Sequence, residues 1–421
     1  MYTLQKNQSR SSAYAISNSR NRGADFATAF SLETAVRLWR QRDGASRVQK
    51  KTSIWHGTAA AIVMAAGMVT AGTVQAQETI KIGFLGPLSG GNAQQGLTAR
   101  NGFQLAIDQA NARDLPFEIE PVILDDGANP QTGVSAALKL TNDPDVVAAT
   151  GHWNSGVALA TAPVITRAGI PFVIWGAISP KITETNNPLL SRVVTTLVNT
   201  NEPLAAWAAE KVGKNIAIVS DTSDYGAANV IAFSQPFEEA GGTIVATETA
   251  PVGTTDFRAT LTKIKGSNPG AVYFGGVVTE AGLVRQQMKE VGLDVPMIGV
   301  DGFYDPEFIK IAGDAAEGTM VGIVKEQEND KLVEMNAAYE AAGFAEAAGT
   351  YTKNAYDAAN IIIAAIEKAG TDRAAVAEAI RATEHDGAMG HTSFDEKGQT
   401  KLPVDLEIRV VRDGSWETLE Q

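Results

Sequence analysis

Cysteine is absent from the 421 residues of the chain. Without cysteine no disulfide forms, so an exported protein of this size depends on its hydrophobic cores, and a lipid anchor on cysteine is excluded. Histidine is also scarce, with four residues in all. His152, His385 and His391 lie too far apart along the chain to suggest a metal site. We therefore expect neither a metal nor another cofactor.

The common catalytic and nucleotide-binding motifs are missing as well. The sequence contains neither H-E-x-x-H nor G-x-S-x-G, and the glycine-rich loop at 86–96 matches neither G-x-G-x-x-G nor a Walker loop. Ser155 and His152 form the one conceivable nucleophile and base, but no orienting acid is evident beside them. We therefore expect that the chain is not an enzyme, and a secreted hydrolase or dehydrogenase is the rival hypothesis.

Basic residues are outnumbered, with 35 Lys and Arg against 48 Asp and Glu. Residues 1–76 hold ten of the basic and three of the acidic residues, which leaves the rest of the chain at a net charge of about −20. Such a charge argues against nucleic acid and anionic membrane surfaces as partners.

The N-terminal part does not belong to the folded domain. Lys50 and Lys51 precede an apolar, small-residue run at 58–74, and Val74-Gln75-Ala76 follows it. A basic flank, a short apolar run and an A-x-A-like site are typical of a secretory signal peptide. We predict cleavage after Ala76, export to the periplasm, and a polar extension at 1–47. A membrane anchor is the alternative, which the short run rich in Ala, Gly and Thr disfavours.

Beyond the signal peptide, apolar strand-like runs alternate with amphipathic helical runs. Strands are expected at 79–87, 117–127, 146–151 and 170–177, with helices at 99–112, 131–143 and from 156 onward. A second series starts near Asn199, with strands at 215–221, 243–250, 271–278 and 295–302 and helices at 202–213, 225–242, 256–267 and 280–292. This order predicts an α/β fold with two doubly wound parallel sheets. Residues 325–385 are mostly Ala-rich helix, and Asp413-Gly414 predicts a terminal hairpin.

Candidate binding residues follow the expected strand ends, where ligands bind in open parallel sheets. Ser155 is expected at a helix N-cap, where its hydroxyl either caps the helix or, with free N–H groups, holds a carboxylate. Trp153 beside it either walls a pocket or fills core. Asp301 follows an apolar run and is either a turn residue or the partner of a ligand cation.

Six stretches in order give the chain a family resemblance. The run at 146–164 is followed by "DYG" (224–226), "VYFGG" (272–276), "VGLDVPMIGVDG" (291–302), "IAGDAAEGTMV" (311–321) and "FDEKG" (394–398). Together they resemble the periplasmic leucine/isoleucine/valine-binding proteins, the solute receptors of branched-chain amino acid ABC transporters. The likeness covers about residues 78–421.

The resemblance implies two α/β lobes joined by three crossings that close on a ligand like a hinge. Lobe one would comprise 78–197 and 324–399, and lobe two would comprise 198–323 and 400–421. This division agrees with the break near Asn199. The return of the chain to lobe one is implied by the resemblance alone.

The resemblance also implies roles for individual residues. Ser155 would hold the ligand carboxylate, Ala177 and Asp301 would receive the ammonium, and Tyr225 would close over the ligand. Two positions depart from the family pattern. Ile178 stands where a threonine is common, and Gln95 stands where close relatives have a large aromatic residue. With Trp153 and Trp175 near the other loops, the pocket is expected to differ in shape from that of those relatives.

We therefore expect a periplasmic receptor that binds a branched-chain or related amino acid and delivers it to an inner-membrane ABC permease. It would act as a monomer and without nucleic acid. The alternative is the same transport role with a small amide or an aromatic carboxylate as the ligand. A DNA-binding regulator of the same fold would need a helix-turn-helix where the signal peptide lies.

Overall fold

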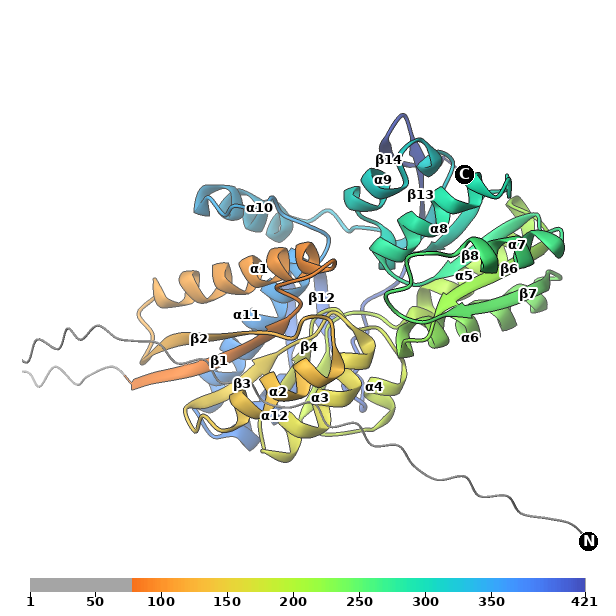
Figure 1. Cartoon of the computed structure of the whole chain (residues 1–421). Helices are drawn as coiled ribbons and strands as arrows, with labels where there is room; N and C mark the ends of the chain where they lie inside the picture. Colours follow the sequence, from red (N-terminus) through yellow and green to blue (C-terminus); the bar gives the residue numbers. More distant parts are fainter. Residues whose placement is uncertain (1–77, 421) are drawn as a thin grey trace, which may run out of the picture. The chain divides into compact units, whose positions relative to one another are not determined.

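The computed structural model describes residues 78–420 (Figure 1). The predicted signal peptide, its cleavage after Ala76 and the extension at 1–47 lie outside these residues. The first sheet has five parallel strands in the order β2-β1-β3-β4-β5. They are β1 (Glu78–Gly86), β2 (Phe117–Asp125), β3 (Val146–Thr150), β4 (Phe172–Ile174) and β5 (Leu190–Arg192).

Helices cover both faces of this sheet because its strands are apolar on both sides. On β1, Ile82 and Phe84 pack with α1 (Ala93–Asn111) and α11 (Thr352–Ala369), while Leu85 packs with α2 (Pro130–Thr141) and α3 (Ser155–Arg167). Each such side chain, when fully buried, contributes about 1.5–3 kcal/mol. Figure 1 shows α11, in blue, alongside α1, in orange, although the two are far apart in the sequence.

The second sheet repeats this pattern with seven strands, in the order β14-β13-β10-β9-β8-β6-β7. Its parallel strands are β6 (Asn215–Asp221), β7 (Thr243–Ala250), β8 (Ala271–Gly275), β9 (Met297–Val300) and β10 (Met320–Val324). On β6, Ile216 and Ile218 face α5 (Leu197–Lys211) and α6 (Asp224–Glu239). Ala217 and Val219 face α7 (Arg258–Gly266), α8 (Val278–Glu290) and α9 (Pro306–Ala312).

Two antiparallel strands, β13 (Leu406–Arg412) and β14 (Ser415–Thr418), extend the second sheet beside β10. Asp413 and Gly414 join them with positive φ at both residues, at 48° and 76°. A two-residue turn of this kind matches the twist of a hairpin. The predicted terminal hairpin is confirmed.

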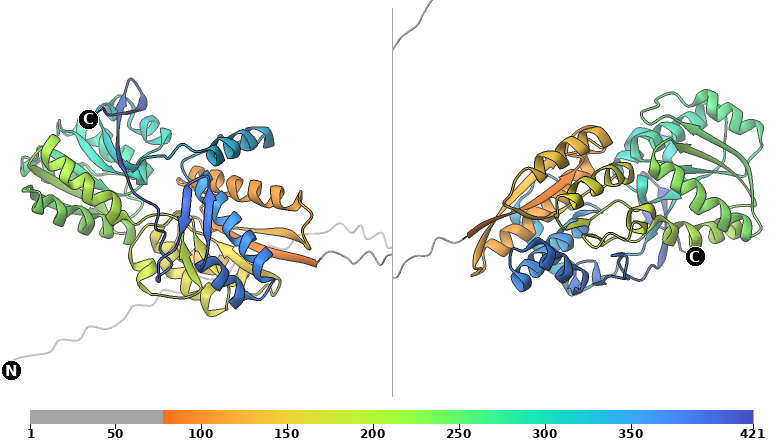
Figure 2. Two further views of the ribbon diagram at one scale, coloured as in Figure 1. Left: turned by 180° about the vertical axis from the view of Figure 1, so that it is seen from behind. Right: turned by 90° about the horizontal axis from the view of Figure 1, so that it is seen from below.

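The chain passes three times between the two sheets. It leaves the first after β5, returns after β10 through α10 (Asp330–Ala342), α11 and α12 (Arg373–Arg381), and leaves again after the hairpin β11 (Glu384–Gly387) and β12 (Gly390–Ser393). Figure 2 shows this last, dark-blue segment running from the hairpin toward β13. The predicted fold of two doubly wound sheets with three crossings is confirmed.

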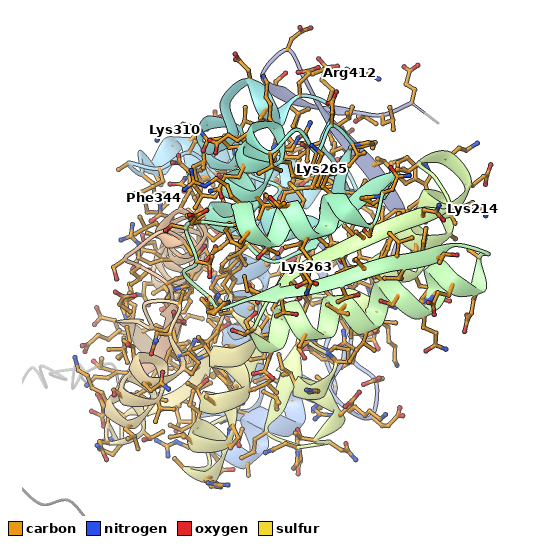
Figure 3. All side chains as sticks on the ribbon, turned by 45° about the vertical axis from the view of Figure 1, so that its right-hand side comes forward. Lys214, Lys263, Lys265, Lys310, Phe344 and Arg412 are labelled. Atoms are coloured by element: carbon orange, nitrogen blue, oxygen red, sulfur yellow. The ribbon has the colours of Figure 1, made fainter. Side chains whose placement is uncertain are left out.

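Lysine side chains satisfy carbonyls at the C-terminal ends of two helices of the second sheet. Lys214 donates to Ala240 O at 2.9 Å and Lys265 donates to Val291 O at 2.9 Å. Both acceptors are the residues that follow α6 and α8, and both lysines are labelled in Figure 3. A cation at a helix C-terminus also complements the helix dipole.

The structure corrects three predicted helix limits. The N-cap of α3 is Asn154, and Ser155 is the first helical residue instead of the cap. Helix α5 begins at Leu197, five residues before its predicted start, because Thr196 and Asn199 form a capping box. The Ala-rich stretch at 325–385 is broken between α10 and α11, where Gly343 ends α10 in the left-handed conformation.

Candidate ligand-binding site

The two sheets share one strand order, and this order indicates at which edge of each sheet a ligand is expected to bind. Both β2-β1-β3-β4-β5 and β7-β6-β8-β9-β10 put the first strand of the series between the second and the third. Sheets of this order bind ligands beyond the carboxyl ends of their strands, at the switch point. The predicted residues lie after such ends: Gln95 in α1, Trp153 and Ser155 after β3, Ala177 and Ile178 after β4, Tyr225 in α6 and Asp301 after β9.

Ser155 is buried at the first turn of α3, and its Oγ accepts a hydrogen bond from the Ser179 N–H at 3.2 Å. This bond joins the loop after β3 to the loop after β4. The N-terminal N–H groups of a helix and a hydroxyl together form a site that favours an anion.

Ser179 is a further candidate site residue, which the sequence did not single out. Its side chain is fully buried, and its Oγ has no hydrogen-bond partner among the described residues. Ile178, one position earlier, carries no polar side-chain group. The family's threonine hydroxyl is missing at Ile178, and the Ser179 hydroxyl is a candidate replacement one residue later. In the sequence, the serine of "WGAIS" at 175–179 is the signal for it.

Asp301 opens a short 3-10 turn, Asp301–Phe303, directly after β9. Its Oδ2 accepts from the Tyr351 hydroxyl at 3.3 Å, whereas its Oδ1 is buried with no partner among the described residues. Burial raises the pKa of Asp301 to about 6, so the carboxyl is mostly ionised at neutral pH. An ionised oxygen that is buried without a partner is costly unless a ligand pairs with it.

The Tyr225 hydroxyl lies against the residue that follows Asp301. A Cβ at Gly302 would collide with this hydroxyl, so only glycine allows the approach. The Tyr225 Oη atom is also buried without a partner in the described part of the chain. Burial raises the pKa of Tyr225 well above its ordinary value and keeps it neutral. The charge of Asp301 acts on Tyr225, and each of the two residues offers an unpartnered oxygen to a cation with N–H donors.

Aromatic rings surround this end of the site. Tyr351, which precedes α11, packs edge-on against Trp153 and Trp175, with ring centroids 6.1 Å away in each case. The Trp175 indole donates to Leu85 O at 3.2 Å and stacks on Phe84, so much of Trp175 belongs to the core. Tyr351 was missed in the sequence because only its place in the loop before a returning helix marks it.

Gln95 makes a different contact from the one expected. Its Nε2 donates to Asp305 Oδ2 at 2.8 Å, between α1 of the first sheet and the N-cap of α9 of the second. The Gln95 side chain therefore forms a hydrogen bond that joins the two halves of the chain.

A cavity of about 1620 Å³ adjoins these residues. Gln95, Ile178, Asp301 and Tyr351 line it, whereas Ser155, Ala177, Trp153 and Tyr225 do not. Typical small-ligand pockets have about 300–1000 Å³, so a small ligand would match only the end of the cavity at Ile178 and Asp301.

His152 does not pair with Ser155. Its Nδ1 lies 2.6 Å from Asp126 Oδ2, both side chains are fully buried, and Ser155 Oγ is bonded to Ser179 instead. The described residues show no nucleophile–base hydrogen bond at this loop, and they contain no cluster of side chains that could hold a metal ion. The pair fixes the loop that carries Trp153 and Ser155.

Comparison with known proteins identifies the family of this fold and site. A family model described as periplasmic binding protein matches residues 79–411. The chain belongs to the periplasmic binding protein family. The leucine-, isoleucine-, valine-, threonine- and alanine-binding protein of Pseudomonas aeruginosa is 34% identical over 332 residues, which are 77% of this chain and 88% of that protein. The resemblance to leucine/isoleucine/valine-binding proteins is confirmed.

Solved structures support the same assignment for this periplasmic binding protein. The leucine-binding protein of Thermotoga maritima superposes with a TM-score of 0.73 at 28% identity, covering 81% of this chain and 98% of that one. The branched-chain amino acid binding protein of Streptococcus pneumoniae, solved with isoleucine, gives 0.72 at 27% identity, covering 81% and 99%. Among the described residues no helix has the length and apolarity to cross a membrane.

Proposed function

We propose that this chain is the periplasmic receptor of an ABC importer and binds a branched-chain or related amino acid. The supporting observation is that Asp301 Oδ1 and Tyr225 Oη are both buried without a partner among the described residues, and that the Tyr225 hydroxyl lies against Gly302, the residue after Asp301. An α-ammonium group brings three N–H donors and one positive charge, which satisfy both atoms. Charge-assisted hydrogen bonds of this kind contribute about 1.5–3 kcal/mol each.

The ligand carboxylate would lie at the opposite end of the site. Ser155 Oγ, the Ser179 hydroxyl and the first N–H groups of α3 would hold it. Tyr351 and Trp153 would enclose the ligand side chain. The Ala177 carbonyl already accepts from the Arg192 guanidinium at 3.2 Å, so this proposal assigns the ammonium to Asp301 and Tyr225 and places Ala177 beside the carboxylate end.

In this proposal the two halves close on the ligand, with lobe one at 78–197 and 324–399 and lobe two at 198–323 and 400–421. The membrane permease would then recognise the closed form, whose population the ligand raises. The receptor would be exported by a signal peptide cleaved after Ala76, act as a monomer, and perform no catalysis.

Calorimetric titration of the ligand-stripped, full-length chain with leucine, isoleucine and valine tests the proposal. We expect saturable binding that weakens tenfold or more in Asp301→Asn, because a charge-assisted bond is lost. Asp294→Asn, at an exposed carboxylate, is the matched control and should bind like the wild type. Heat from none of the three amino acids would refute the proposed ligand class.

An aromatic carboxylate is the second candidate ligand. The rings of Trp153 and Tyr351 favour it, since in this proposal they enclose the ligand side chain. The Asp301 carboxylate opposes it, because an anion without an amine would leave Asp301 Oδ1 unpaired. Titration with benzoate beside leucine decides between the two, and the same experiment with a small aliphatic amide covers the remaining alternative.

A further inference from the structure

Arg192, the last residue of β5, is a fully buried cation. Its guanidinium makes four hydrogen bonds, all to neutral acceptors: Gln399 Oε1 at 2.7 Å, Ala177 O at 3.2 Å, Ser179 O at 2.6 Å and Thr183 Oγ1 at 2.9 Å. No ion pair of this guanidinium occurs among residues 78–420. Buried charges are normally paired, because an uncompensated one is expensive to remove from water.

The side chain stays charged at neutral pH despite its burial. Burial lowers the pKa of Arg192 to about 9, against the weaker opposing effects of Asp395 and Glu184. A positive charge is therefore present inside the first half of the molecule, and no carboxylate in the described part of the chain is bonded to it.

The hydrogen bonds of Arg192 lead to the carboxylate end of the proposed site. Its Nη1 holds the carbonyls of Ala177 and Ser179, and the Ser179 N–H in turn donates to Ser155 Oγ at 3.2 Å. The backbone of the loop at 177–179 thus separates the guanidinium from the groups that would meet the ligand anion.

The same guanidinium also reaches the segment that leads to the second sheet. Gln399, which accepts from Arg192 Nε, donates from its Nε2 to Val194 O at 2.8 Å. Gln399 follows "FDEKG" (394–398), a stretch that carried the family resemblance without an assigned role. Arg192 therefore ties the loop after β4 to two of the three passages between the sheets.

We propose that Arg192 is a positioning residue for the ligand carboxylate: it fixes the loop at 177–179 and supplies the positive charge behind it. The proposal rests on the proposed function and gives that site a counterpart to Asp301. The positive charge lies behind the carboxylate end and the negative charge at the ammonium end. A zwitterion fits both, which explains how the fold tolerates each charge unpaired.

The test compares leucine, leucinamide and benzoate by calorimetric titration in the wild type, Arg192→Gln and Arg192→Lys. Leucinamide keeps the ammonium but lacks the carboxylate, whereas benzoate keeps only a carboxylate. We expect Arg192→Gln to weaken leucine at least about tenfold, as for a unit charge one peptide layer away at an effective dielectric constant near 20. The affinity for leucinamide should change far less, and Arg192→Lys should restore most of the leucine affinity.

A purely structural role would give a different pattern. Equal weakening of leucine and leucinamide in Arg192→Gln, or an Arg192→Lys variant as weak as Arg192→Gln, would overturn the proposal. Arg381→Gln is the matched control, since Arg381 also binds backbone carbonyls, of Asn187 at 2.6 Å and Leu190 at 2.8 Å, but none in the loop at 177–179. It should leave the preference for leucine over leucinamide unchanged.

Two further readouts keep the test decisive. If Arg192→Gln does not fold, Arg192→Lys alone suffices, because a buried ammonium loses its proton more readily than a guanidinium. Its leucine affinity should then fall more steeply than that of the wild type between about pH 7 and 9, and an equal slope would overturn the proposal. If the wild type binds benzoate but not leucine, the proposed amino-acid ligand fails while benzoate still tests Arg192. Binding of neither carboxylate overturns both.

Discussion

At the scale of a single residue, the role proposed for Asp301 in ligand binding opposes the stability of the ligand-free protein. Burial raises the pKa of Asp301 to about 6 in the folded state, so the fold binds this proton more tightly than the unfolded chain does. Ionisation of the group therefore destabilises the protein above pH 6. This destabilisation disappears as the pH falls through 6 toward the ordinary value of an aspartate.

Asp301→Asn is accordingly expected to raise the stability of the ligand-free protein while it weakens amino-acid binding. The free energy of unfolding is expected to rise by about 2–3 kcal/mol at neutral pH, because the pKa of Asp301 in the fold is about two above its ordinary value. Thermal unfolding of the ligand-free wild type and variant at pH 7.5 measures it, with Asp294→Asn as the control. A variant that is both less stable and unchanged in affinity would contradict the role of Asp301.

The affinity for leucine should also depend on pH through Asp301. The ammonium stabilises the ionised carboxyl, so affinity is constant well above pH 6 and falls up to about tenfold per unit below it. Tyr225 and Tyr351, which face Asp301, stay neutral in this range because burial raises their pKa values. Titrations between pH 5 and 8 check this, and an affinity independent of pH in the wild type would count against the account.

Individual site residues differed in how far the sequence could reveal them. Asp301 directly follows β9 and Ser155 lies in the short loop-to-helix junction after β3, and strand ends are visible in the hydrophobic pattern. Tyr351 lies in a loop of a segment whose return to the first sheet periodicity does not show. The expected role of Gln95 at the ligand stays a prediction, and its bond to Asp305 joins residues 210 positions apart, which no local pattern encodes.

At the scale of elements, the contact between α1 and the N-terminus of α9 links the two halves. Asp305 accepts from the Glu307 N–H at 2.7 Å as the N-cap of α9 and from Gln95 Nε2 at 2.8 Å. The carboxylate thus joins a helix start to the opposite sheet. The bond is expected to stabilise the arrangement in which the cleft is narrow.

Gln95→Ala should therefore favour the open arrangement and weaken ligand binding by about five- to tenfold, from the loss of one hydrogen bond of about 1–1.5 kcal/mol. Small-angle X-ray scattering of the ligand-free protein should show a larger radius of gyration. Gln94→Ala, at the exposed neighbouring position, is the control. Unchanged scattering and affinity in Gln95→Ala would show that this bond does not hold the halves together.

The helices and the central strands were largely predictable, because strands such as β3, β8 and β9 are buried along their whole length and most helices are apolar on one face. The first and last residues of the helices were less predictable from the sequence. The cap of α3 moved from Ser155 to Asn154, since the Ser155 hydroxyl accepts from the distant Ser179 N–H instead of from its own helix. A side chain that serves a binding site departs from its local role, which only tertiary contacts reveal.

At the scale of the whole molecule, closure of the two halves can be trapped covalently. A Cβ built on Gly91 lies 4.0 Å from the Thr279 Cβ, within the about 3.5–4.5 Å that a disulfide requires. Gly91 precedes α1 and Thr279 is in the first turn of α8, so the bond would join the two halves. Because the natural chain has no cysteine, the introduced pair cannot form a wrong disulfide within the chain.

The double variant Gly91→Cys, Thr279→Cys should oxidise readily and then exchange ligand far more slowly than the wild type. Oxidation with leucine present should retain leucine through gel filtration, and a reductant should release it. The two single variants are the controls and should exchange ligand normally. An oxidised double variant with wild-type exchange would mean that binding needs no separation of the halves.

The most direct test of the central claim is one calorimetric comparison of leucine with isocaproate, which is leucine without its amino group. If the unpartnered oxygens of Asp301 and Tyr225 receive an ammonium group, the amino group of leucine is essential for binding. We expect saturable binding of leucine and no measurable binding of isocaproate at pH 7.5. Isocaproate binding as tightly as leucine, or more tightly, would contradict it.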